Sequence, residues 1–121
     1  MRRALLAGFL ICLTGQALAC SCARPGPDAP QPEIIVNARV LTVTRVGTGI
    51  VARLRVLRAE KGRTPRTFDV HTAGHPVACG VEFQKGAVER YAIGRHDGRY
   101  TANSCMQFLM NYRRQPTIPA E

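Results

Sequence analysis

Two cysteines separated by a single serine, Cys20-Ser21-Cys22, are the residues of this chain that most clearly point to chemistry. They directly follow Ala17-Leu18-Ala19, a small-residue pattern typical of a signal-peptidase cleavage site. Cleavage there would make Cys20 the first residue of the mature chain, carrying both a thiol and a free α-amine. Such a residue is either anchored to lipid through its sulfur or fixed by a disulfide. When it is fixed by a disulfide, its amine and carbonyl are free to chelate a metal ion that has an open coordination position.

The residues before Cys20 have the features of a secretion signal. Arg2 and Arg3 form a positive start, and residues 4–13 form an apolar run. That run is shorter than the roughly 20 residues that a membrane-spanning helix needs. We therefore expect residues 1–19 to be a signal peptide and the protein to be exported, either periplasmic or secreted. A lipoprotein signal has Leu, Val or Ile where this chain has Ala17, so ordinary cleavage is favoured and lipidation of Cys20 is the alternative.

The cysteine count predicts two disulfides. Of the five cysteines, Cys12 lies in the expected signal peptide and four remain. An even number of cysteines in a small exported domain is typical of a disulfide framework. Cys20 and Cys22 are too close to pair easily with each other, so each is expected to pair with Cys79 or Cys105. The residue order leaves both cross-pairings open.

Length and composition indicate one small, basic, non-enzymatic domain. The 121 residues carry a net charge of +9, which falls to +7 when Arg2 and Arg3 are removed. An excess of this size favours anionic partners. Nucleic acid is not expected, because the chain has no Trp and its aromatic residues are not interleaved with its arginines. Arg53, Arg55 and Arg58 come closest to a basic cluster. No nucleophile motif, phosphate-binding loop or free cysteine suggests an enzyme, and no cofactor is expected.

The pattern of apolar residues and turn residues predicts an all-β fold. Ile50, Ala52, Leu54 and Val56 alternate with residues facing outward, as in a half-buried strand. Asp97-Gly98 is a strong hairpin signal, and residues 23–32 form a Pro-rich extended arm. Strands are predicted over residues 34–43, 50–57, 68–72, 91–93 and 100–104, followed by a short helix over 106–114 and a flexible tail over 115–121. Five short strands with Gly-rich turns favour a small barrel.

His71 and His75 have a spacing that occurs in metal sites. The intervening Thr72-Ala73-Gly74 and the following Pro76 argue against a helix that would present both histidines on one face. We expect them to be surface loop residues rather than ligands.

Four segments of the chain together resemble a known family. They are Cys20-Ser21-Cys22, residues 56–62 (VLRAEKG), residues 78–83 (ACGVEF), and the stretch from Arg90 to Cys105. In this order they resemble the netrin-like domain at the N-terminus of the tissue inhibitors of metalloproteinases. The resemblance covers residues 20 to about 110. It implies a TIMP-like domain over residues 20–114, folded as a five-stranded OB-fold barrel with disulfides Cys20–Cys79 and Cys22–Cys105.

The resemblance also implies a function. In those inhibitors the amine and carbonyl of the first residue bind the catalytic zinc of a protease, so Cys20 would be the chelating residue here. Ser21 would enter the specificity pocket of the protease. Two ridges would make the remaining contacts, one formed by Cys22, Ala23, Arg24 and Pro25 and the other by Pro76, Val77, Ala78 and Cys79.

The expected function is therefore inhibition of a zinc metalloproteinase. The alternative is a non-inhibitory periplasmic or lipid-anchored binding module for an anionic polymer or a protein partner, with membrane attachment only through a lipidated Cys20.

Overall fold

The computed structural model describes residues 20–22 and 31–112. The predicted signal peptide, most of the Pro-rich arm and the predicted tail lie outside these residues, as do Ala23, Arg24 and Pro25. The described chain forms five strands, one 3-10 turn and one helix: β1 (Ile34–Val46), β2 (Gly49–Lys61), β3 (Thr67–Ala73), η1 (Pro76–Ala78), β4 (Val88–His96), β5 (Arg99–Thr101) and α1 (Ser104–Tyr112). No helix among the described residues is long and apolar enough to cross a bilayer.

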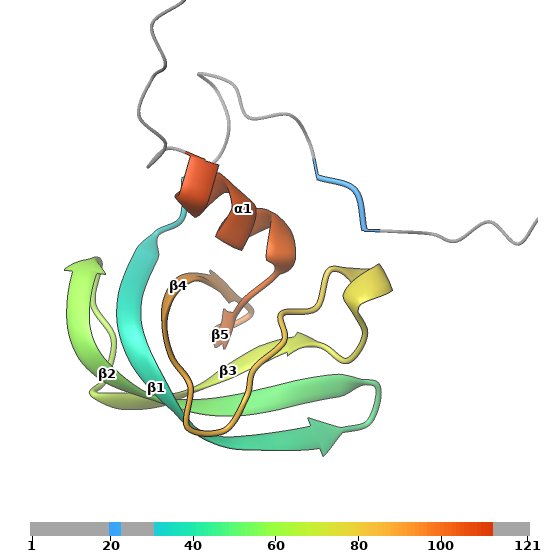
Figure 1. The fold of residues 1–121 in the computed structure, drawn as a ribbon, viewed down its shortest axis with the longest axis horizontal. Helices are drawn as coiled ribbons and strands as arrows, with labels where there is room; N and C mark the ends of the chain where they lie inside the picture. Colours follow the sequence, from blue (N-terminus) through green and yellow to red (C-terminus); the bar gives the residue numbers. More distant parts are fainter. Residues whose placement is uncertain (1–19, 23–30, 113–121) are drawn as a thin grey trace, which may run out of the picture.

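The five strands close into a barrel in the order β1-β2-β3-β5-β4 (Figure 1). Every neighbouring pair is antiparallel except β3 and β5, which run parallel at the pairs Val70–Tyr100 and His71–Thr101. Three register shifts interrupt the pairing of β1 with β2. Extra residues of this kind bend a strand and increase its twist, which lets two long strands curve around a small barrel.

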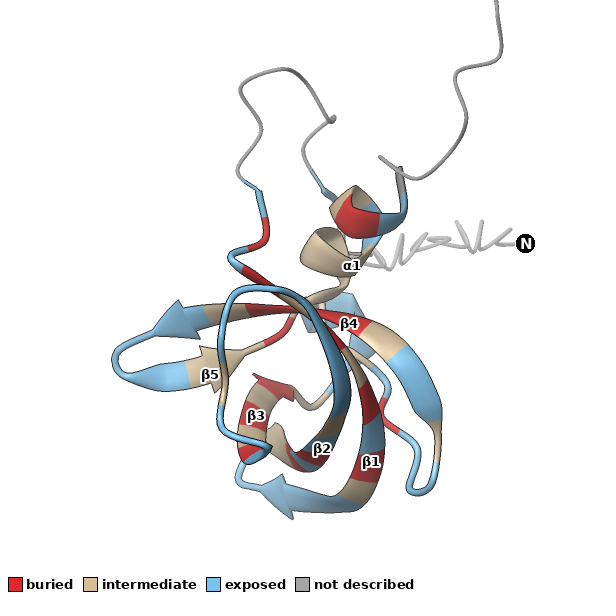
Figure 2. Ribbon diagram, turned by 90° about the vertical axis from the view of Figure 1, so that its left-hand side faces the viewer, coloured by how far each residue is buried: buried red, intermediate tan, exposed pale blue. Residues whose placement is uncertain are grey.

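The core lies inside the barrel and comes from alternating residues, as the sequence pattern predicts. Ile34, Val36, Ala38 and Val40 of β1 are buried, and residues 42–46 of the same strand are exposed (Figure 2). The largest core side chain is Tyr91, whose ring lies 5.1 Å from that of Phe83. Burial, together with the nearby negative charge of Glu89, raises the pKa of Tyr91 to about 12. The raised pKa keeps the hydroxyl neutral inside the barrel even in moderately alkaline solution.

The predicted strands are all present, and most of them are longer than predicted. Asp97 and Gly98 have φ values of +50° and +73° at the tip of the β4–β5 hairpin, as the sequence predicts for this turn. The prediction of a strand over residues 100–104 is wrong at its end, because β5 stops at Thr101. The side chain of Asn103 accepts a hydrogen bond of 2.8 Å from the backbone N–H of Met106 and so caps α1. Cys105 consequently lies in the first turn of a helix rather than at the end of a strand.

Gln107 attaches α1 to the barrel through its side-chain amide. The amide donates to the carbonyl oxygen of Ala92 at 2.7 Å and accepts from the N–H of Ala92 at 3.0 Å. Ala92 is fully buried in β4, and β5 is too short to reach it, because its pairing with β4 begins at Gly94. The side chain of Gln107 thus replaces the missing strand at this point.

Replacing Gln107 with Ala is therefore expected to lower the free energy of unfolding by about 2 kcal/mol, since two buried backbone groups lose their partners. Urea denaturation measures this loss. Gln84→Ala is the matched control, because Gln84 is exposed and its side chain donates a hydrogen bond of 3.4 Å to the exposed side chain of Glu82. Equal stability of the two variants would contradict the role assigned to Gln107.

Candidate binding site at the two disulfides

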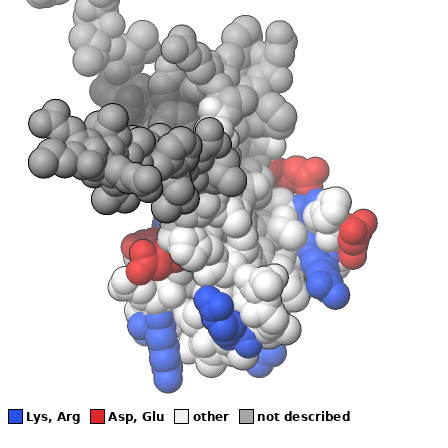
Figure 3. Space-filling view, turned by 90° about the vertical axis from the view of Figure 1, so that its right-hand side faces the viewer, with Lys and Arg blue, Asp and Glu red and all other residues white. Residues whose placement is uncertain are grey.

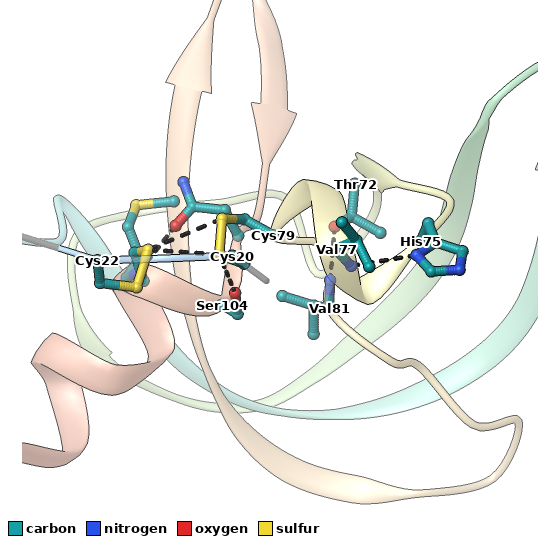
Figure 4. The surroundings of a disulfide bond; sticks show 11 residues. Cys20, Cys22, Thr72, His75, Val77, Cys79, Val81 and Ser104 are labelled. Atoms are coloured by element: carbon teal, nitrogen blue, oxygen red, sulfur yellow. Dashed lines mark hydrogen bonds between the residues drawn. A yellow bond between two sulfur atoms is a disulfide. The ribbon is translucent and has the colours of Figure 1, made fainter. Parts of the chain in front are cut away.

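Two disulfides attach the segment 20–22 to the barrel. Cys20 bonds to Cys79 with a Cα–Cα distance of 5.1 Å, and Cys22 bonds to Cys105 with a Cα–Cα distance of 5.3 Å. This pairing is the one implied by the family resemblance, and residue order alone did not select it. Because Cys79 follows η1 and Cys105 lies in α1, the segment is joined to two elements that are distant in sequence (Figure 4).

The two disulfides lie against each other. The Sγ atom of Cys105 is 3.9 Å from that of Cys20 and 4.0 Å from that of Cys79. The hydroxyl of Ser104 lies 3.4 Å from Cys20 Sγ. Two covalent bonds placed two residues apart fix both ends of the segment 20–22, so the backbone of Ser21 between them has little freedom.

The turn around η1 is held by its own backbone and by His75. The N–H of Val77 donates to His75 Nδ1 at 3.1 Å, and the N–H of Cys79 donates to the carbonyl oxygen of Pro76 at 3.0 Å. Cys79 has a φ of +63°, an unusual value for a residue with a side chain. Its carbonyl accepts from the N–H of Ser104 at 2.9 Å, and its sulfur bonds to Cys20, so contacts on both sides maintain this conformation.

The resulting surface combines two exposed segments. Ser21 and Cys22 are exposed, as are Pro76, Val77 and Ala78, whereas Cys20 and Cys79 beneath them are half-buried. Val77 is an apolar side chain with 45% of its surface exposed. The structure thus brings together seven of the ten residues predicted to contact a partner, and the other three, residues 23–25, lie outside the described residues.

A pocket of about 300 Å³ adjoins η1, and sequence reasoning missed it. Thr72 forms part of its support, because its hydroxyl accepts a hydrogen bond of 2.9 Å from the N–H of Val81. The only sequence signal for the pocket is the pair of glycines, Gly74 and Gly80, on either side of the turn. The lining residues are Ile50, Ala73, Gly74, His75, Pro76, Gly80, Val81, Glu82 and Phe83.

The two histidines differ in position. His71 is half-buried in β3 opposite Val51, so its placement in a surface loop is wrong, whereas His75 is an exposed loop residue that caps η1. Within the described part of the chain, the one group with metal-ligand spacing consists of the sulfur atoms of Cys20, Cys79 and Cys105. All three sulfurs are in disulfides and are therefore not thiolate ligands.

Comparison of the sequence with models of known protein families gives no match, and comparison with curated proteins gives none either.

Proposed function

We propose that the protein is an exported, netrin-like OB-fold barrel that inhibits a zinc metalloproteinase. The fold part of the proposal is supported by the closed strand order β1-β2-β3-β5-β4, in which β3 and β5 are parallel and the other neighbours antiparallel; OB-type barrels have this arrangement. The chain adds a disulfide-linked N-terminal segment and a C-terminal helix to that barrel.

The observation that carries the functional proposal is the disulfide between Cys20 and Cys79. It supports the proposal because it joins the segment 20–22, in which Ser21 is exposed, to the residue that follows the exposed turn Pro76–Ala78. After removal of residues 1–19, the α-amine of Cys20 would lie close to that turn.

The chemistry of such an N-terminus suits a catalytic zinc ion. A catalytic zinc keeps one exchangeable position, normally occupied by water. The α-amine and carbonyl of Cys20 would close a five-membered chelate ring there and displace the water. Because an α-amine has a pKa near 8, its deprotonation costs little at neutral pH. Ser21, which follows the chelating residue and is exposed, would then extend into the neighbouring specificity pocket of the protease.

The test uses the oxidised mature chain beginning at Cys20 against a panel of zinc endopeptidases, with a serine endopeptidase as a control. We expect inhibition of at least one zinc enzyme and none of the serine enzyme. One alanine added before Cys20 converts its α-amine into a peptide amide, which cannot chelate zinc. We expect the loss of the chelate to weaken inhibition by about a thousandfold or more. An alanine added after Glu121 is the matched control and should change nothing.

Intact mass measured without reductant tests the required N-terminus. The expected mass corresponds to an unmodified chain from Cys20 that has lost the four hydrogens of two disulfides. An added lipid mass, inhibition that survives the N-terminal alanine, or no inhibition of any zinc enzyme in the panel would overturn the proposal.

A further inference from the structure

Two arginines face each other on the outside of the barrel. Arg39 of β1 is directly opposite Arg55 of β2 in the strand register, and both are exposed. Like charges directly opposite each other in a sheet destabilise it. Among the described residues no carboxylate pairs with either of them. By contrast, Arg53 pairs with Asp69 at 3.0 Å, and this hydrogen bond raises the pKa of Arg53.

A third arginine and three apolar side chains complete a groove around this pair. Arg66, in the connection between β2 and β3, also has no carboxylate partner among the described residues. The groove has a volume of about 380 Å³ and is lined by Arg39, Leu41, Arg55, Val56, Leu57 and Arg66.

The two leucines of the groove lie at irregularities of the β1–β2 pairing. Leu41 falls at the register shift between Val40 and Thr42 and has no partner in β2. Leu57 likewise has no partner in β1, and 52% of its surface is exposed. Such irregularities redirect side chains, and here they leave apolar groups beside guanidinium groups.

The groove is separate from the surface at the disulfides. The connection between β2 and β3 lies on the left of Figure 1, and η1 lies on the right. Figure 3 shows the side that carries η1, where basic side chains are spread out and acidic side chains lie among them. The groove therefore differs from that side in having three arginines together without an acidic neighbour among its lining residues.

The composition of the groove selects its ligand. Three guanidinium groups suit a phosphate, and the apolar side chains suit a hydrocarbon portion next to that phosphate. Among the described residues no aromatic side chain lines the groove, and these residues therefore give no platform for stacking a nucleic acid base. A soluble polyanion would bind the arginines but would not contact the leucines, which would stay exposed to water.

We propose that this groove binds the phosphate and adjoining acyl region of an anionic phospholipid and so places the protein on the surface of an anionic bilayer. Arginines near such a surface are attracted by its negative potential. This attachment needs no acyl group on Cys20 and does not depend on protease inhibition.

The test is co-sedimentation of the oxidised protein with phosphatidylcholine vesicles, with and without phosphatidylglycerol. We expect binding only to the anionic vesicles and a loss of about fivefold per arginine removed. The variant with Arg39→Gln, Arg55→Gln and Arg66→Gln should thus bind about a hundredfold more weakly. The matched control carries Arg45→Gln, Lys85→Gln and Arg99→Gln, which remove the same charge elsewhere, and should lose less than tenfold. Equal losses in the two triple variants would overturn the groove as the site.

A second comparison separates a lipid from a soluble polyanion. Replacing Leu41 and Leu57 with Ser should weaken binding to anionic vesicles several-fold and leave binding to inorganic polyphosphate unchanged. Polyphosphate that binds as tightly as the vesicles, with vesicle binding insensitive to both leucines, would overturn the lipid as ligand. Thermal unfolding checks that the variants fold. Removal of the like-charge pair is expected to leave the melting temperature unchanged or higher.

Discussion

Reduction of the two disulfides is expected to lower the melting temperature of the domain by about 20 °C or more, or to unfold it at 37 °C. The bonds link residues separated by 59 and 83 positions. Closing loops of this length restricts the unfolded chain by about 4 kcal/mol per disulfide. A small domain has a net stability of about 5–15 kcal/mol in total, and each kcal/mol corresponds to about 4–8 °C at this size. Circular dichroism with and without a phosphine reductant measures the shift.

Removing the disulfides one at a time separates their contributions. The variant with Cys20→Ala and Cys79→Ala frees the predicted chelating residue, and the variant with Cys22→Ala and Cys105→Ala frees α1 from the segment. Each is expected to melt below the parent. The first should also inhibit more weakly, because residue 20 keeps its α-amine and carbonyl but is no longer fixed to residue 79 by a disulfide. Unchanged melting of the parent under reducing conditions would contradict a structural role for both bonds.

Replacing Gly80 with Ala is expected to cost about 3 kcal/mol and to displace the turn that follows β3. A Cβ atom at Gly80 would lie 2.2 Å from the carbonyl oxygen of Ala73 and 3.0 Å from that of His75. Both are backbone atoms, so the chain itself must move rather than a flexible side chain. The N–H of Gly80 also donates a hydrogen bond of 3.2 Å to the carbonyl oxygen of His75, which further fixes the turn.

Urea denaturation measures the cost at Gly80, and the protease assay should show weaker inhibition because Pro76–Ala78 moves. Gly86→Ala provides the comparison. Gly86 has a φ of +87°, but a Cβ atom there would contact nothing within 4 Å. Its substitution is expected to cost about 1 kcal/mol from backbone conformation alone and to leave inhibition intact. A Gly80 variant no less stable than the Gly86 variant would contradict the close approach.

The strands were predictable because a half-buried strand displays its geometry in its sequence. The alternation of Ala52 and Leu54 with Arg53 and Arg55 has the period of a strand, and Asp97-Gly98 suits the positive φ values of the hairpin. The end of β5 was not predictable in this way. The strand ends after Thr101 because Asn103 caps a helix there. The backbone groups of β4 that β5 leaves without a partner are bound by Gln107, and Ala92, which carries them, is 15 residues away in sequence.

The disulfide surface was predictable in outline and the arginine groove was not. Cys20 and Cys79 are conspicuous in the sequence. Residue order did not decide how they pair, because both cross-pairings close long loops, and the pairing was predicted from the family resemblance. The sequence pointed instead to Arg53, Arg55 and Arg58 as the basic cluster. The structure neutralises Arg53 with Asp69 and places Arg39 opposite Arg55. That juxtaposition depends on register shifts between two strands, which no local pattern of residues records.

The long sequence separation of the disulfide partners has a consequence for the order of folding. Cys20 and Cys22 are synthesised before any strand, and Cys105 follows the last strand. Cys20 meets Cys79, and Cys22 meets Cys105, only when η1 and α1 have packed at the end of the barrel. Barrels with such distant contacts fold slowly, in milliseconds to seconds. We therefore expect oxidative refolding to show strand formation first and native thiol pairing second, with a catalyst of disulfide exchange accelerating only the second phase.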